Sequence, residues 1–523
     1  MPYDGGAVDG PVDLLRLLSR GGGADPDGEG IVSTWHRFTW QELDEAVDRL
    51  THNYREIGLR PGDRVASLMP NRVDLPIHYL ACFRAGLVVT PLNYRYMPPE
   101  IDHALDVSEA SVIVAHHERA DDLRASQLAG SVPMGTIWYS RQGRGDRPEL
   151  EDLIASGTST GELGDHDPDA PAALFFTSGS TGPAKGVTHS RSSLGWMFSV
   201  AAAAFELTGD DAFLPGSSMS HLGSFLWTFA ALSVGAKVVV AHTFDPEEIL
   251  GLLRTERPTV MAMIPAALVA VVRDHGATVD DFASLRLCRA GSDKVSAELD
   301  REFAHLTSFP IDEGYGMSEV GLATLNPPSG EIREGSVGRA VPGVSISIRD
   351  NEHNEVAVGE VGKVWISTPA RTVGYWRDPD ATERVLRDGW LDSGDLMRVD
   401  GDGYFWFFGR KKQIIVHDGS NISPHEVEDA LDEHPAVALS GAVGIHDTVH
   451  GENVRAYITI RDGEERPTSQ DLIRWARERI GYKAPDEIVF LDDIPLNPTG
   501  KVDRNRLKQL AEDHVHPHGL TEA

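Results

Sequence analysis

The stretch "TSGSTGPAKGV" (Thr177–Val187) combines several hydroxyl side chains, three glycines and a lysine, and it directly follows an apolar segment at residues 172–176. Glycines let backbone N–H groups approach phosphate oxygens, while hydroxyls and the lysine ammonium add hydrogen bonds and charge. The stretch therefore predicts a phosphate-binding loop after a strand. A Walker A loop is excluded because Gly182 is not followed by Lys and Ser or Thr, and the stretch also lacks the G-x-G-x-x-G dinucleotide pattern.

Strand-like and helix-like patterns alternate on both sides of this loop. Residues 59–93 predict a turn, a short strand, a helix closed by Gly86 and a second strand. Further buried strands are expected at 110–117, 236–243 and 258–265, whereas the Gly/Asp-rich stretch 21–30 is expected to be a loop. Strands separated by helices are typical of parallel sheets.

The pattern changes after about residue 335, where short alternating strands and glycine-rich turns indicate a small β-lobe. Beyond Arg410 the chain predicts a helix that starts at Ser423-Pro424, an amphipathic helix at 471–480 and a strand at 487–495. The predicted fold class is α/β. A large N-terminal domain of layered α/β subdomains plus the β-lobe (1–409) precedes a small, mobile α+β C-terminal domain (410–523).

Composition limits the partners of this chain. Its 48 basic and 80 acidic residues give a formal net charge of −32, which argues against nucleic acid and anionic membranes as general partners. Two cysteines support no disulfide framework or cysteine metal site. No secretory signal is apparent, and the longest apolar run, 260–272, is too short to span a bilayer. We expect a soluble, cytoplasmic protein without a transmembrane segment, and the sequence leaves a homodimer open.

The phosphate stretch resembles that of the acyl-adenylate-forming (AMP-binding) superfamily, which includes acyl-CoA synthetases. Four further segments resemble that superfamily in the same order: "GYGMSE" (314–319), "WLDSGDLMRVDGDGYFWFFGR" (390–410), "RKKQIIVHDGSNISPHEVE" (410–428) and "LNPTGKVDR" (496–504). The resemblance covers nearly the whole chain. It implies that ATP and a carboxylate form an acyl-adenylate and pyrophosphate, and that a thiol then displaces AMP.

The resemblance also implies roles for individual residues. Lys501, Lys185 and Glu319 would be catalytic, and Glu319 would bind Mg²⁺. ATP and AMP would contact Thr177, Ser178, Gly179, Ser180, Thr181, Gly182, Lys185, Glu313, Gly314, Tyr315, Ser318, Asp395, Arg410 and Lys501, and of these Asp395 and Arg410 would bind the ribose. Ser318 stands where the family most often has threonine, so a hydroxyl is retained. Lys412 would be the hinge between the two half-reactions, and the loop Asp418, Gly419 and Asn421 would face CoA.

The acyl pocket is implied at His221, Gly291 and Gly316. The segment "SMSHLGSF" (218–225) lacks the aspartate with which amino-acid-activating relatives pair an ammonium group, which favours a simple carboxylic acid. His221 either gates the pocket or is a packed side chain. Ser292-Asp293 departs from the family's pattern of a second glycine and Ala-Pro, so the adenine contacts there stay open.

The sequence thus predicts an ATP-dependent ligase that joins a carboxylic acid, a fatty acid in the first instance, to CoA. The alternatives are an aryl acid–CoA ligase, an acyl-AMP ligase that loads a carrier-protein thiol, an oxidative or luciferase-like member, and a nucleotide-binding protein that has lost catalysis. Intact Lys185, Glu319 and Lys501 argue against the last alternative.

Overall fold

The computed structural model describes residues 3–140, 149–159, 161, 163–164, 166–177, 184–242, 245–290, 295, 297–417, 420–447, 450–497 and 501–515. The chain forms two compact units, of which the first comprises Met1–Ile346 and Trp365–Leu391 and the second Ser347–Val364 and Asp392–Ala523. The chain therefore passes three times from one unit to the other. The boundary between residues 409 and 410 stays a prediction.

A nine-stranded sheet in the first unit has the order β16-β15-β14-β13-β12-β10-β11-β2-β3. Its strands are β2 (Glu29–Ser33), β3 (Arg37–Thr39), β10 (Ala212–Gly216), β11 (Lys237–Val240), β12 (Val260–Met263), β13 (Leu287–Ala290), β14 (Asp312–Met317), β15 (Gly321–Leu325) and β16 (Arg339–Ala340). The strands from β14 to β2 pair in parallel, and β15, β16 and β3 add antiparallel edges. The predicted strands at 236–243 and 258–265 are confirmed as β11 and β12.

A seven-stranded sheet of the same unit has the order β19-β9-β8-β5-β4-β6-β7. Its strands are β4 (Arg64–Leu68), β5 (Val88–Pro91), β6 (Val112–His116), β7 (Thr136–Tyr139), β8 (Pro171–Thr177), β9 (Lys185–Ser190) and β19 (Gly374–Tyr375). The predicted strand–helix–strand order of residues 59–93 is confirmed by β4, α3 (Asp74–Ala85) and β5. Gly86 ends α3 with a φ of 75°, a left-handed conformation that favours glycine.

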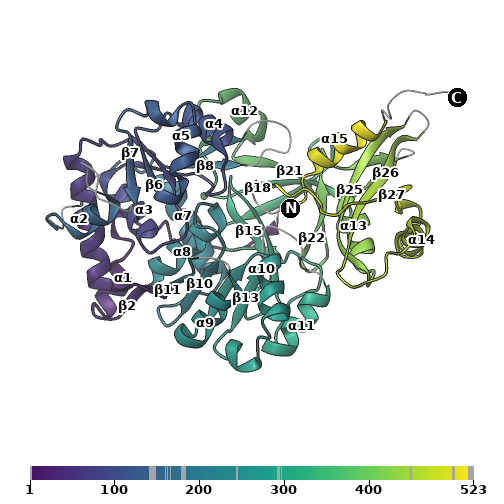
Figure 1. The fold of residues 1–523 in the computed structure, drawn as a ribbon, viewed down its shortest axis with the longest axis horizontal. Coiled ribbons are helices and arrows are strands. Elements are labelled where there is room, and N and C mark those ends of the chain that lie inside the picture. Colours follow the sequence, from purple (N-terminus) through teal and green to yellow (C-terminus); the bar gives the residue numbers. More distant parts are fainter. Residues whose placement is uncertain are drawn as a thin grey trace. The chain divides into compact units, whose positions relative to one another are not determined.

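Helices and short strands complete the first unit (Figure 1). The remaining helices are α1 (Ser19–Ala24), α2 (Trp40–Glu56), α4 (Pro98–Ser108), α5 (Ala120–Ala125), α6 (Leu150–Ala155), α7 (Arg191–Ala204), α8 (Leu222–Val234), α9 (Pro246–Glu256), α10 (Pro265–Val269), α11 (Ala297–Thr307) and α12 (Pro379–Val385). Short helical turns lie at 14–16, 117–119, 129–131, 270–274 and 279–282, and short strands are β1 (Tyr3–Asp4) and β20 (Leu386–Arg387). The prediction of a loop at 21–30 is wrong at both ends, because α1 extends to residue 24 and β2 starts at residue 29.

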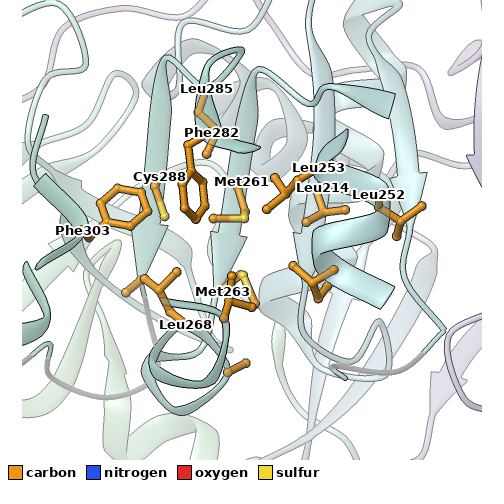
Figure 2. Packing of buried hydrophobic residues seen from close by; sticks show 14 of the residues in the cluster. Leu214, Leu252, Leu253, Met261, Met263, Leu268, Phe282, Leu285, Cys288 and Phe303 are labelled. Atoms are coloured by element: carbon orange, nitrogen blue, oxygen red, sulfur yellow. The ribbon is translucent and has the colours of Figure 1, made fainter. Parts of the chain in front are cut away.

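One face of the nine-stranded sheet packs on α9, α10 and α11 through a large apolar cluster. Cys288 of β13 lies in this cluster, and Figure 2 shows it together with Phe282 and Phe303. The two phenylalanine rings are 5.5 Å apart between centroids and meet edge to face. Burial of this kind fixes which residues of β13 face the cluster.

The second unit contains a five-stranded sheet in the order β24-β23-β26-β25, with β27 paired to β26. The elements of the unit from residue 405 on are β22 (Phe405–Arg410), β23 (Ile415–His417), β24 (Ser420–Ile422), α13 (Pro424–Asp432), β25 (Val437–Asp447), β26 (Gly451–Ile460), α14 (Ser469–Ile480), β27 (Glu487–Phe490) and α15 (Arg504–Val515), with a short helical turn at 481–483. Strand β22 pairs with β21 and lies outside the five-stranded sheet. Pro424 occupies the first turn of α13 and α14 spans the predicted amphipathic stretch, so both predicted helices are confirmed.

The chain passes between the units within β17 (Ser345–Arg349), β18 (Gly362–Ser367) and β21 (Trp390–Val399). These strands and β22 confirm the short strands predicted after residue 335. The mixed α/β fold, with a large N-terminal and a smaller C-terminal part, is likewise confirmed. None of the helices in the described ranges combines the length and the apolar character needed to cross a bilayer.

Candidate active site

Lys185, the lysine predicted to bind phosphate, lies at the start of β9, paired with Thr177 at the end of β8. Its Nζ lies 4.8 Å from the centroid of the Tyr375 ring. The Tyr375 hydroxyl in turn donates a hydrogen bond of 2.8 Å to Oε1 of Glu319. The structure therefore brings Lys185 and Glu319, both predicted to be catalytic, together around one tyrosine. The predicted contacts at Ser178–Gly182 lie outside the described residues.

Tyr375 is positioned by backbone pairing between β19 and β9. Tyr375 pairs with Val187, and the N–H of Trp376 donates to the Gly186 carbonyl at 2.7 Å. A Cβ atom at Gly186 on β9 would lie only 2.8 Å from the side chain of Leu174 on β8, so a larger residue would disturb the pairing of these two strands. Sequence reasoning missed Tyr375, because a two-residue strand carries no periodicity that would reveal it.

Glu319 is held from both sides through the backbone. Its carbonyl accepts a hydrogen bond of 2.6 Å from the Thr372 N–H, and the preceding Ser318 carbonyl lies 2.8 Å from Nε2 of the buried His189. Burial lowers the pKa of His189 to about 4, so its ring is neutral at pH 7 and can donate one N–H to that carbonyl. The predicted phosphate contact of Ser318 stays a prediction, and its backbone helps to fix Glu319.

Glu319 is the residue predicted to bind Mg²⁺. No group of three or more His, Cys, Asp and Glu side chains suited to a metal occurs in the parts of the chain that the structure covers. Mg²⁺ in nucleotide sites is commonly held by one or two carboxylates and completed by substrate phosphates and water. A buried carboxylate, 6% exposed, that shares Tyr375 with a lysine predicted to bind phosphate fits a metal that binds together with ATP.

Glu313, Gly314 and Tyr315, which are predicted to contact ATP and AMP, lie on β14. This strand pairs antiparallel with β15 and carries a register shift between Tyr315 and Gly316. The strands approach closely, since a Cβ atom at Gly316 would lie 2.3 Å from the Gly321 carbonyl oxygen. Tyr315 is 9% exposed, and the Glu313 carboxylate accepts a bond of 3.4 Å from the Val295 N–H. Glu313, Gly314, Tyr315 and Gly316 therefore all lie on β14. The nucleotide contacts of the first three and the acyl-pocket role of Gly316 stay predictions.

His221 lies immediately before helix α8 in extended conformation, and its N–H donates to the Ser218 carbonyl at 3.0 Å. Its side chain is half-buried, so both proposed roles, gating and packing, stay predictions. Gly291, also predicted for the acyl pocket, lies outside the described residues.

In the second unit, Asp395 on β21 pairs in register with Arg410 on β22. Their side chains form an ion pair of 3.3 Å between Nε and Oδ1, with Asp395 buried and Arg410 about half exposed. The Asp395 N–H donates to the Ser393 hydroxyl at 3.1 Å. The structure thus brings together the two residues predicted to bind ribose.

We expect Asp395→Ala to raise the apparent KM for ATP by at least about 100-fold, because two charge-assisted bonds to ribose hydroxyls would be lost. Initial rates over a range of ATP concentrations would measure this. Arg398→Ala, which removes an exposed side chain of the same strand, is the matched control. Unchanged ATP affinity in a folded Asp395→Ala variant would contradict the ribose assignment, and Asp395→Asn serves if the alanine variant unfolds.

Lys412, the predicted hinge, is exposed in the turn that follows β22. The turn is closed by the Gln413 N–H, which donates to the Arg410 carbonyl at 2.8 Å. In the predicted CoA-facing loop, Asp418 and Gly419 lie outside the described residues, and Asn421 lies on β24, where its backbone pairs with Val416.

Lys501 is exposed at the end of a loop, between Asn497 and the start of α15. The loop is closed by two hydrogen bonds, from the Asn497 N–H to the Lys501 carbonyl at 2.7 Å and from the Lys501 N–H to Oδ1 of Asn497 at 3.1 Å. Leu496 and Val502 form an antiparallel bridge at its base. The structure therefore places Lys501 in the second unit, with its backbone N–H and carbonyl both bonded to Asn497.

Comparison with known proteins gives the family. The family model described as AMP-binding enzyme matches residues 20–376, and its C-terminal domain model matches residues 426–501. The chain belongs to the AMP-binding enzyme family. The prediction of an AMP-forming acid–thiol ligase is thereby confirmed at the level of this family.

Individual relatives in the AMP-binding family span nearly the whole chain. A feruloyl-CoA synthase from Amycolatopsis sp is 33% identical over 480 residues, which cover 90% of this chain and 94% of the relative. The fatty acid–[acyl-carrier-protein] ligase ScoC from Streptomyces coeruleorubidus is 30% identical and covers 95% and 96%. The crystal structure of ATP-bound MatB from Rhodopseudomonas palustris superposes with a TM-score of 0.88 at 29% identity, covering 97% of this chain and all of that one.

Proposed function

We propose that this protein activates a carboxylic acid with ATP to an acyl-adenylate and then transfers the acyl group to CoA, releasing pyrophosphate and AMP. The observation that carries the proposal is the arrangement of Lys185, Tyr375 and Glu319 in a member of the AMP-binding family. The Lys185 ammonium and the Glu319 carboxylate, which both contact Tyr375, suit a nucleoside triphosphate. Such a ligand needs positive charge near its phosphates and a metal ion bound by a carboxylate.

The chemistry requires charge control, because a carboxylate must attack the α-phosphorus of a polyanion. Lys185 would neutralise the β- and γ-phosphates, and Asp395 would orient the nucleotide through its ribose hydroxyls. Lys501 would lie between the acid's carboxylate and the α-phosphate, where it offsets the charge of two approaching anions. Glu319 would hold Mg²⁺, which supplies further neutralisation of phosphate charge when bound.

The acid is proposed to be a fatty acid or an aryl acid. "SMSHLGSF" offers no carboxylate for an ammonium group, so free amino acids are disfavoured. The relatives named for feruloyl and fatty acyl substrates support both acid classes for this chain. CoA as acceptor is supported by the feruloyl-CoA synthase, with Asp418, Gly419 and Asn421 as the loop proposed to face it.

A second candidate function changes only the acceptor. ScoC, the relative from Streptomyces coeruleorubidus, is named as a ligase that acts on an acyl-carrier protein. In this alternative the acyl-adenylate forms in the same way and the carrier-protein thiol displaces AMP.

The decisive experiment analyses the nucleotide product for a panel of fatty, aryl and amino acids with CoA, with a phosphopantetheinylated carrier protein, or with neither. We expect AMP and pyrophosphate to form with Mg²⁺ and a fatty or aryl acid, and we expect the thioester to form with CoA. Formation of ADP would contradict adenylation, and efficient pyrophosphate exchange with free amino acids would contradict the proposed substrate class. Thioester formation only with the carrier protein would support the second candidate.

A further inference from the structure

A buried arginine, Arg289, lies in the middle of strand β13. It is 8% exposed. Its neighbours Cys288 and Ala290 belong to the apolar cluster on one face of the sheet, where Figure 2 shows Cys288. Side chains alternate along a strand, so Arg289 faces away from that cluster. Its guanidinium carbon lies 4.8 Å from the ring centroid of Trp227 on helix α8.

One N–H group of the Arg289 guanidinium, that of Nε, is buried without an acceptor among the residues whose structure is described. The neighbouring Asp312, which pairs with Arg289 in register, uses Oδ1 to accept a bond of 3.1 Å from Asn326, while its buried Oδ2 likewise has no donor in the same part of the structure. Burial lowers the pKa of Arg289 to about 10 and raises that of Asp312 to about 7.

A buried charge without hydrogen-bonded partners costs several kcal/mol, so proteins rarely retain one without a use. Trp227 contributes a cation–π contact, but a ring face satisfies none of the guanidinium N–H groups. The guanidinium is therefore prepared to donate hydrogen bonds to a ligand, and an oxygen anion is the group it would bind most strongly.

Arg289 also lies between two segments that the proposed function assigns to substrates. A Cβ atom at Gly314, on the predicted nucleotide strand, would lie 3.2 Å from Nε of Arg289. Trp227 belongs to α8, the helix that follows His221, and a Cβ atom at Gly223 of "SMSHLGSF" would lie 3.7 Å from the Trp227 indole nitrogen. The strand with Gly314, the helix with Trp227 and Arg289 itself all lie in the first unit.

We propose that Arg289 determines acid specificity by binding an oxygen acceptor at the end of the acid that lies away from the reacting carboxylate. This inference rests on the proposed acid-activating function. A second carboxylate is the strongest form of such an acceptor and a phenolic oxygen a weaker one. An acid with a plain hydrocarbon end would leave the Nε–H of Arg289 without an acceptor among the described residues.

The test compares kcat/KM for matched pairs of acids, hexanoic against hexanedioic acid and cinnamic against 4-hydroxycinnamic acid. We expect the wild type to prefer the acceptor-bearing acid in at least one pair, and we expect Arg289→Met to reduce that preference by about 10- to 100-fold. If the wild type has the higher kcat/KM for hexanedioic acid, the acceptor that Arg289 binds is a carboxylate. If it has the higher kcat/KM only for 4-hydroxycinnamic acid, the acceptor is a phenolic oxygen. Arg286→Met is the matched control, since Arg286 pairs with Asp211 instead, and it should leave the preference unchanged.

Two results would overturn the inference: a wild type that prefers the plain acid in both pairs, or an Arg289→Met variant that loses activity equally for both members of each pair. Arg289→Lys, which keeps the charge, replaces the methionine variant if that variant unfolds. If the wild type forms AMP from no acid, the proposed function fails. The shift in Tm that each acid produces in wild type and variant then tests the Arg289 contact separately.

Discussion

Lys501→Ala is expected to slow acyl-adenylate formation by about 100- to 1,000-fold, and to leave thioester formation from supplied acyl-adenylate and CoA near the wild-type rate. The reason is that the lysine would offset charge only while the carboxylate and the α-phosphate approach each other. Two hydrogen bonds join Asn497 to the backbone N–H and carbonyl of Lys501, and truncating the side chain leaves the groups that form both bonds in the chain.

Single-turnover assays of the two half-reactions would measure this asymmetry. Lys508→Ala, which removes a partly exposed lysine of α15, is the control and should change neither step. A bulky residue at Gly419 should have the opposite effect, slowing transfer to CoA more than adenylation, because that loop is proposed to face CoA. An equal loss of both steps in Lys501→Ala would show that the lysine does not separate the half-reactions.

Glu319→Gln is expected to reduce the rate of pyrophosphate release by at least about 100-fold at limiting Mg²⁺. The amide keeps the shape and the ability to accept the Tyr375 hydrogen bond, but it removes the negative charge that a hard cation prefers. Titration of activity with Mg²⁺ separates this from a folding defect, since the variant should need much higher metal concentrations.

Tyr375→Phe is the matched comparison for Glu319. It keeps the ring face near Lys185 and removes only the hydroxyl that donates to the carboxylate. Loss of a partner that orients a metal ligand typically costs about 10- to 100-fold, so its effect on the Mg²⁺ titration should be the smaller of the two. A Glu319→Gln variant with the wild-type Mg²⁺ requirement would rule out a metal role for Glu319.

The parts of the fold that the sequence predicted well have a local cause. The strand–helix–strand order at 59–93 follows from apolar runs of strand and helix length and from Gly86. A glycine after an apolar helix predicts the helix end, because glycine readily adopts the left-handed φ found there. Helix α13 was likewise visible because proline favours the first turn of a helix.

The errors and omissions have long-range causes. Three consecutive glycines disfavour a helix, yet α1 contains them. A Cβ atom at Gly21 would come within 2.3 Å of the Trp40 ring, a contact that the local sequence does not reveal. Tyr375 reaches Lys185 and Glu319 only through a two-residue strand that pairs with β9. Arg289 looks like an ordinary charged residue until the fold buries it beside Trp227.

The threefold passage of the chain between the two units has a consequence for biosynthesis. Tyr375 leaves the ribosome about 190 residues after Lys185, which at roughly 5–20 residues per second is an interval of about 10–40 s. During that interval β9 lacks its β19 partner and presents an open strand edge, a template for pairing with other nascent chains. The cluster of Lys185, Tyr375 and Glu319 is therefore completed late in translation. Slow or interrupted synthesis between residues 190 and 375 would prolong the time during which this strand edge stays open.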